Sequence, residues 1–251
     1  LFITEGASDF IGGVILFDET IRQSRTDGTP FPEYLNELGM LAGIKVDAGA
    51  KALAGFADET VTEGLDGLRD RLAEYASLGA KFAKWRAVIN VSETIPSTFC
   101  LKANAHALAR YAALCQEHNI VPIVEPEVLM DGTHSIERCE EVTSAALDVV
   151  FQELEEHGVV LEGIILKPNM VISGSDAQDR ATPSEVAEAT VRCLKKHVPE
   201  NVAGMTINRW CGSSMQAIHS AAGAISMNAG NAFICCGVES MTRVPINGLN
   251  F

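Results

Sequence analysis

The sequence predicts an α/β fold built on a parallel sheet, because short apolar runs alternate with longer amphipathic segments in a regular strand–helix rhythm. Most of the apolar runs lack strict alternation of polar and apolar residues, as is typical of strands covered on both faces. The chain has 251 residues, of which 47% are hydrophobic and 21% charged. A chain of this length and composition can bury a large core without disulfides or metals.

Six strands are expected where apolar runs are bounded by Gly, Pro or polar residues. These strands cover residues 11–19, 44–47, 81–90, 120–129, 163–166 and 203–207. The 120–129 strand is expected to be broken by its two prolines, because proline has no N–H to donate to a sheet.

Helices are expected where apolar residues recur every three or four positions. They cover residues 64–78, 98–118, 133–157 and 185–197, with a short helix or turn at 31–41. The last helix has a clear start signal, with Thr182 as cap, Pro183 as first residue and Glu185 completing a capping box. The polar, glycine-containing segments between these elements are expected to be loops, at residues 23–31, 51–63 and 173–179.

The composition excludes several classes of function. A net charge of −14 disfavours nucleic acid or an anionic membrane as partner. Seven cysteines without framework spacing indicate a reducing cytoplasm rather than a disulfide scaffold. The sequence has no CxxC or HExxH motif and no apolar stretch of membrane-spanning length, so we expect no cofactor, no metal and no membrane partner. The chain starts at Leu1 rather than Met, and we expect the native N-terminus to precede it.

Lys167 is the first candidate catalytic residue. It directly follows the apolar end of LEGIIL and precedes Pro168, so it is expected at the C-terminal tip of a buried strand. A buried ammonium is costly to keep charged, and a neutral amine attacks carbonyl carbons to form a Schiff base. The alternative, commoner for any single lysine, is a side chain that extends its charged end to water.

Other charged residues also fall at the C-terminal ends of expected strands. Lys84 and Arg86 lie two positions apart, as do Glu125 and Glu127, so each pair shares one face of its strand. Lys45 lies in a further strand. In a βα barrel this end of the sheet builds the active site. Lysines from three strands with two carboxylates from a fourth therefore favour a catalytic site over scattered surface charges.

Long segments of the chain closely resemble the class I fructose-bisphosphate aldolases, in that family's order. They are GGVILFDET at 12–20, GIKVD at 43–47, GLDGL at 64–68, FAKWR at 82–86, LARYA at 108–112, VPIVEPEVL at 121–129 and LEGIILKPNMV at 161–171. The resemblance implies a (β/α)8 TIM barrel that cleaves fructose 1,6-bisphosphate to dihydroxyacetone phosphate and glyceraldehyde 3-phosphate in glycolysis. It also implies a cytoplasmic homo-oligomer, a tetramer, with a phosphorylated ketose as substrate.

The same resemblance gives each candidate residue a role. Lys167 matches the lysine that forms the Schiff base, and Lys84 matches a lysine beside that amine. Glu125 matches the carboxylate that shuttles protons, and Glu127 matches a glutamate that pairs with active-site lysines. Two further cations would line the pocket and support phosphate binding, Lys45 and Arg86. A second cation beside the nucleophile would disfavour its protonation, and the iminium would accept the electrons of the breaking C3–C4 bond.

The resemblance implies an incomplete barrel, with residues 1–205 as a truncated aldolase unit. The first strand, with an aspartate that handles the C4 hydroxyl proton, would precede Leu1. The family's last strand and its C-terminal tail ending in tyrosine are not matched. Near Thr206 the chain departs from the family, whose corresponding strand leads into a Ser-Gly-Gly phosphate loop.

Residues 206–251 resemble thiolases instead, in TINRWCGSSMQAIHSAA at 206–222 and AFICCGVESMTRVP at 232–245. By this resemblance Cys211 is the acyl-accepting thiol at a helix N-terminus, where the helix dipole favours a thiolate. The downstream histidine and second cysteine of thiolases are not matched. The junction has two interpretations: an erroneous joining of two genes, or a βαβ unit that occupies the seventh and eighth barrel positions.

The sequence therefore leaves three alternative functions. The first is a Schiff-base aldolase, which the strand-end residues favour. The second is an inactive remnant with a structural or oligomerisation role only. The third is a thiolase-type acyl-CoA acyltransferase that uses Cys211. It is disfavoured because the histidine and second cysteine of thiolases are not matched.

Overall fold

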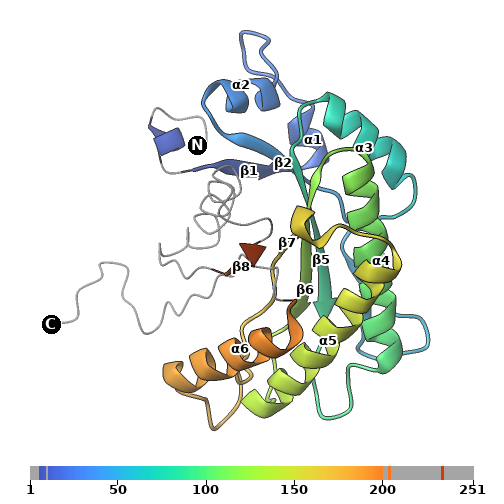
Figure 1. Ribbon diagram of the computed structural model, residues 1–251, viewed down its shortest axis with the longest axis vertical. Helices are drawn as coiled ribbons and strands as arrows, with labels where there is room; N and C mark the ends of the chain where they lie inside the picture. The colour runs from blue at the N-terminus through green and yellow to red at the C-terminus, as the bar shows by residue number, and fades with distance from the viewer. Residues whose placement is uncertain (1–5, 10, 200–202, 205–232, 235–251) are drawn as a thin grey trace, which may run out of the picture.

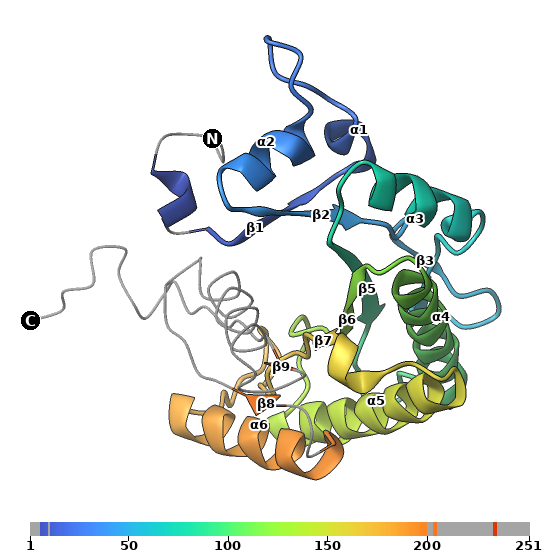
Figure 2. The ribbon, with the colours of Figure 1, turned by 45° about the horizontal axis from the view of Figure 1, so that its top comes forward.

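The computed structural model describes residues 6–9, 11–199, 203–204 and 233–234. A seven-stranded parallel sheet runs in the order β1-β2-β5-β6-β7-β9-β8. The sheet curves, and helices cover its convex side (Figures 1 and 2). We call its other side the inner face. The strands are β1 (Gly13–Leu16), β2 (Leu41–Lys45), β5 (Phe82–Ile89), β6 (Val121–Val128), β7 (Ile165–Leu166), β8 (Ala203–Gly204) and β9 (Phe233–Ile234).

The helices follow the strands in the predicted βα rhythm, which confirms an α/β fold with a parallel sheet. They are α1 (Asp18–Ile21), α2 (Phe31–Glu37), α3 (Leu68–Ser77), α4 (Thr98–Glu117), α5 (Ile136–Glu156) and α6 (Pro183–His197), with 3-10 turns at Ala7–Asp9 and Leu161–Gly163. The predicted capping box of α6 is present, with Thr182 and Glu185 each bonding the other's backbone N–H. Among the helices of the described residues, none is both long and apolar enough to cross a membrane.

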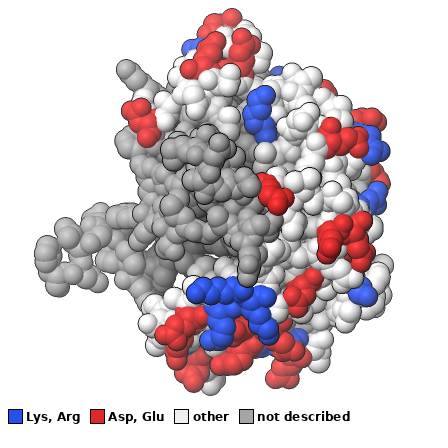
Figure 3. Space-filling model, in the orientation of Figure 1, with Lys and Arg blue, Asp and Glu red and all other residues white. Residues whose placement is uncertain are grey.

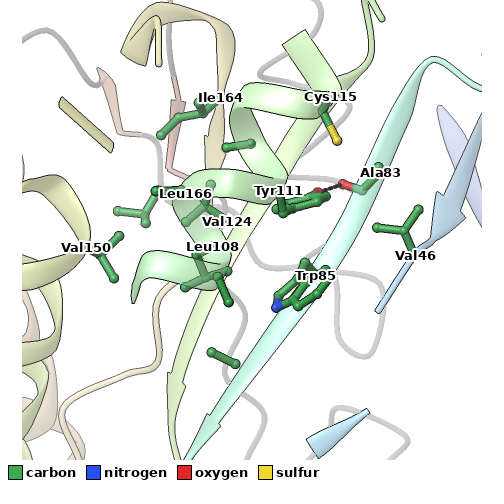
Figure 4. Close-up of a cluster of buried hydrophobic side chains, with 14 of the residues drawn as sticks. Val46, Ala83, Trp85, Leu108, Tyr111, Cys115, Val124, Val150, Ile164 and Leu166 are labelled. Carbon is green, nitrogen blue, oxygen red and sulfur yellow. Dashed lines mark hydrogen bonds between the residues drawn. The ribbon is translucent and has the colours of Figure 1, made fainter. Parts of the chain in front are cut away.

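The core lies between the convex face of the sheet and α4 (Figure 4). Trp85 of β5 and Tyr111 of α4 are fully buried, with ring centroids 5.5 Å apart. The Tyr111 hydroxyl donates a 2.6 Å hydrogen bond to the carbonyl oxygen of Ala83, which ties the helix to the sheet. Burial alternates along β5, so Ala83, Trp85 and Ala87 pack against helices while Lys84 and Arg86 point to the inner face.

Strand β6 is continuous, so the prediction that its prolines break it was wrong. In a parallel strand, alternate residues direct their N–H and C=O groups to opposite neighbours. Val121 and Leu129 donate to β5-side carbonyls at 3.0 and 2.9 Å, which places Pro122 and Pro126 on the β7 side. Strand β7 pairs only with Ile123 and Val124, so both prolines lie outside the paired positions and no sheet hydrogen bond is lost.

Two further expectations differ from the structure. The segment expected as a loop at 51–63 contains an antiparallel hairpin of β3 (Ala50–Ala52) and β4 (Thr60–Thr62). The β-branched residues Thr60–Thr62 favour a strand, but the flanking polar residues and glycine led to the prediction of a loop. The strand expected at 163–166 is shorter, because its first part forms the 3-10 turn Leu161–Gly163.

The end of the sheet departs from the expected strand sequence. Phe233 and Ile234 of β9 pair with β7 on one side and with β8 on the other. The later segment therefore lies between β7 and β8, whereas a βαβ unit filling the seventh and eighth positions would place β8 beside β7. Apart from Ala203–Gly204 and Phe233–Ile234, the thiolase-like segment falls outside the described residues.

Candidate active site

Strand register places six of the candidate residues on the inner face. Residues paired across parallel strands point to the same side of a sheet. Lys45 pairs with Lys84, and Arg86 pairs with Glu125. Because side chains alternate along each strand, the remaining candidates face the same way, namely Glu127 of β6 and Lys167 just beyond β7.

The inner face is divided along the strands by polarity. Its N-terminal end is apolar, with Gly43 of β2 paired to Phe82 of β5, and one layer further on Ile123 and Ile165 lie level with Lys84. Gly43 is required there, since a Cβ at this position would lie 2.3 Å from the Phe82 ring. The charged residues follow at the C-terminal half, which is where βα barrels place their catalytic groups.

Glu125 joins two lysines at the centre of this charged half. Its side chain is only 2% exposed, so its carboxylate requires charged partners. Lys167 Nζ donates a short hydrogen bond to Glu125 Oε1. Lys84 Nζ lies 3.1 Å from Oε2, at ion-pair distance but without hydrogen-bond alignment. A carboxylate between two amines can exchange protons with either of them.

Lys167 remains accessible although it contacts a buried acid. Its side chain is 30% exposed, against 2% for Glu125. Its backbone N–H donates a 2.8 Å hydrogen bond to the carbonyl oxygen of Val124, which extends the β6–β7 pairing by one residue. The amine is thus fixed beside the acid while one side stays open to a ligand.

Two more ion pairs border this centre. Arg86 Nε donates to Glu127 Oε2, so Glu127 pairs with an arginine and not with the lysines that the resemblance implied. Lys45 Nζ lies 2.5 Å from Asp47 Oδ1 and donates to the Asp47 carbonyl at 3.0 Å. Arg86 and Lys45 are also connected, because the Arg86 backbone N–H lies 3.4 Å from Asp47 Oδ2.

Asp47 is a site residue that the sequence reasoning did not single out. Its side chain is 2% exposed, and it accepts a 3.0 Å hydrogen bond from the backbone N–H of Gly49. Gly49 has a φ of 86°, a left-handed conformation that glycine adopts without strain. The signal was available in the sequence, since Asp47 follows Lys45 by two positions and so faces the same way.

Asn169 is a second residue that sequence reasoning missed. Its Oδ1 accepts a 3.2 Å hydrogen bond from the backbone N–H of Val128, while Nδ2 donates to Thr143 Oγ1 at 2.9 Å. These bonds tie the segment after Lys167 to β6 and to α5. Asn169 thereby holds the backbone that carries the candidate nucleophile.

The charge of the site differs in sign from that of the whole chain. The inner face brings four cations against three carboxylates, Lys45, Lys84, Arg86 and Lys167 against Asp47, Glu125 and Glu127. This small positive excess occurs in a chain of net charge −14. On the face seen in Figure 3, acidic and basic side chains of the described residues intermix, with a group of Lys and Arg over α6. The remaining candidate, Cys211, lies outside the described residues.

Comparison with known proteins gives a consistent family. A family model described as "Glycolytic: Fructose-bisphosphate aldolase class-I" matches residues 1–232. A "Probable fructose-bisphosphate aldolase class 1" of Xanthomonas axonopodis is 61% identical over 205 residues, covering 82% of this chain and 61% of the relative. The "Fructose-bisphosphate aldolase, cytoplasmic isozyme" of Spinacia oleracea is 50% identical over 205 residues, covering 82% of this chain and 57% of the relative.

A solved structure shows the same similarity. It is that of the fructose-bisphosphate aldolase of Plasmodium falciparum, crystallised with TRAP and a small-molecule inhibitor. The TM-score is 0.76 at 45% identity, over 79% of this chain and 58% of that chain. The present chain thus spans about three fifths of the length of the relatives that it matches. The family match includes residues 206–232, which the sequence resemblance assigned to a thiolase-like segment.

Proposed function

The chain belongs to the class I fructose-bisphosphate aldolase family, and from this premise we propose that its inner face performs Schiff-base aldol cleavage. The substrate is fructose 1,6-bisphosphate, and the products are dihydroxyacetone phosphate and glyceraldehyde 3-phosphate. One observation carries the proposal most strongly. The buried carboxylate of Glu125 lies between the amines of Lys84 and Lys167, each from a different strand.

The first step is attack of the Lys167 amine on the substrate ketone. Lys84 lies on the other side of the shared carboxylate, so Glu125 contacts both amines. Glu125 contacts the Lys167 amine and can move the protons that carbinolamine formation and loss of water require. The product of this step is an iminium on Lys167.

The second step is cleavage of the C3–C4 bond. The C4 hydroxyl gives its proton to water, the bonding electrons pass into the iminium, and the aldehyde product leaves. The resulting enamine takes up a proton at C3, and water then hydrolyses the imine to release the ketone product. The iminium itself draws the electrons from the breaking bond.

Substrate phosphates require cations at the margins of this centre. Lys45 and Arg86 lie there, each paired to a carboxylate, Asp47 and Glu127. Both side chains are partly exposed, at 28% and 40%. We propose that a phosphate competes with these carboxylates for the two cations, because Arg and Lys bind phosphate oxygens strongly.

We further propose a cytoplasmic homotetramer as the assembly and an incomplete (β/α)8 barrel as the architecture of residues 1–205. The cytoplasmic proposal is supported by the names of the spinach and Arabidopsis relatives, "cytoplasmic isozyme" and "cytosolic". The barrel is supported by the curved parallel sheet with helices on its convex side (Figure 2).

The test is a cleavage assay on the purified chain with fructose 1,6-bisphosphate. Lys167→Ala should reduce product formation to background, because no amine remains to form the iminium. Cys211→Ser should cleave at the wild-type rate. Cleavage that survives Lys167→Ala would refute the assigned nucleophile, and absence of cleavage in the folded wild-type chain would favour an inactive remnant.

The segment at residues 206–251 carries a separate proposal. Its sequence match around Cys211 supports a thiolase-like origin, and we propose that it is a bystander to aldol chemistry. A loss of aldol cleavage in Cys211→Ser would contradict this. Transfer of an acyl group from acetyl-CoA to Cys211, seen by mass spectrometry, would support the acyltransferase alternative.

A further inference from the structure

We propose that His106, Glu153 and His157 form a binding site for a zinc ion on the helical layer, outside the aldolase site. Within the part of the chain that the structure describes, this is the one group of three or more His, Cys, Asp or Glu residues arranged to hold a metal ion. One potential ligand atom from each residue lies within 4.8 Å of the other two. His106 lies on α4, and Glu153 and His157 lie at the end of α5. None of the three belongs to the charged residues of the inner face.

The spacing of the ligand atoms approaches that of a tetrahedral metal site. Zinc bonds of about 2.0–2.1 Å at tetrahedral angles place neighbouring ligand atoms about 3.3 Å apart. His106 Nδ1 lies 3.0 Å from Glu153 Oε2, close to this spacing. The two imidazole rings meet edge to face, with centroids 4.9 Å apart. Small side-chain rotations would therefore bring all three ligands onto one ion.

The fold fixes these residues from both sides. Glu153 and His157 are four positions apart at the end of α5, so they lie on one helical face. His106 lies on α4, which packs beside α5 (Figure 1). His157 Nδ1 lies 2.8 Å from the carbonyl oxygen of Glu153. Such a carbonyl contact on one ring nitrogen is the usual way to orient a metal-binding histidine, with the other nitrogen left for the ion.

The ligand types select a transition metal. Two imidazoles and one carboxylate suit zinc, whereas magnesium and calcium prefer oxygen ligands throughout. The His106 side chain is 51% exposed, while Glu153 and His157 are 18% and 23% exposed. The ion would thus be anchored by two half-buried ligands and keep an open coordination position towards water. The three ligands lie on α4 and at the end of α5, which cover the convex side of the sheet (Figure 2), and none of them is one of the charged residues of the inner face.

The experiment is titration of the metal-free full chain with Zn²⁺ by calorimetry, with Mg²⁺ as a comparison. We expect the wild-type chain to bind Zn²⁺, and the double variant His106→Gln/His157→Gln to bind it at least tenfold more weakly. Zinc should also raise the Tm of the wild type but not that of the double variant. His118→Gln is the matched control. His118 directly follows the last residue of α4, and its Nε2 lies 3.7 Å from Glu117 Oε1, outside the cluster. The zinc affinity of the His118→Gln variant should therefore equal that of the wild type.

The seven cysteines are the competing zinc ligands, and Co²⁺ spectra distinguish them. The wild-type chain should show the weak d–d bands of nitrogen and oxygen ligands without an intense thiolate charge-transfer band. Equal zinc affinity of the wild type and the double variant, no zinc binding at all, or a thiolate band for the site would each overturn the proposal. The cobalt result holds even if the double variant does not fold.

Discussion

At the scale of single residues, each charge on the inner face lies beside a group of opposite charge. Glu125 is buried between two amines, Asp47 is buried beside Lys45, and Glu127 contacts Arg86. The sequence predicted which residues gather here, because strand ends and two-residue spacing determine the face. It did not predict how they pair, since pairing depends on side-chain reach across the sheet.

Glu125→Gln tests the central pair. The amide keeps the size of the side chain but cannot carry the protons of imine formation, so kcat should fall about 10²–10⁴-fold. Glu127→Gln is the matched comparison and should reduce kcat less, since Glu127 contacts Arg86 and not Lys167. Steady-state cleavage assays measure both. Equal losses in the two variants would contradict the assigned proton shuttle.

His134 gives a prediction for the pH dependence of stability. It is buried, and neither ring nitrogen makes a hydrogen bond of normal geometry. Burial lowers the pKa of His134 below 6.5, a larger effect than the opposing Ile172 backbone, and nearby Arg138 lowers it further. Below pH 6.5 the unfolded chain therefore binds a proton that the folded chain does not, so stability falls as the pH drops towards the folded-state pKa.

The variant His134→Phe removes this titration and keeps an aromatic ring of similar size. Its urea midpoint should fall less than that of the wild type between about pH 7.5 and 5.5. The other histidines are present in both proteins, so the difference between the two curves isolates His134. Parallel curves would show that His134 does not contribute.

At the scale of elements, the sequence predicted most helices and strands because apolar periodicity and capping signals agree. Thr182, Pro183 and Glu185 fixed the start of α6 correctly. The errors arose where tertiary pairing outweighs local preference. Pro122 and Pro126 are tolerated in β6 only because β7 is two residues long, and the length of a neighbouring strand cannot be inferred from β6 itself.

Tyr111→Phe tests how α4 is fixed to the sheet. Its hydroxyl donates to the carbonyl oxygen of Ala83 at 2.6 Å and lies 3.3 Å from that of Ile123, bridging β5 and β6. Loss of the hydroxyl leaves buried carbonyl groups without this donor, so the free energy of unfolding should fall by about 1–3 kcal/mol. Denaturant unfolding measures the change, with the partly exposed Tyr34→Phe as control. An effect equal to that of the control would contradict this role.

At the scale of the whole molecule, the parallel sheet brings to one face residues that are far apart in the sequence. This is why the clustering of the candidate site residues was predictable: parallel strands share a C-terminal edge, so strand-end residues meet. The His106–Glu153–His157 cluster was not predictable in the same way. His106 and Glu153 are 47 residues apart on two different helices, and the packing of the helices, not a sequence motif, brings the ligands together.

The most direct test of Schiff-base formation on Lys167 is borohydride trapping with dihydroxyacetone phosphate, followed by peptide mapping. Lys167 is half-buried, contacts Glu125 and has Lys84 nearby, so its amine should form the imine that borohydride reduces. The account predicts a single stable adduct on Lys167, absent in Lys167→Ala. A folded chain that gives no adduct, or an adduct on another lysine, would contradict it.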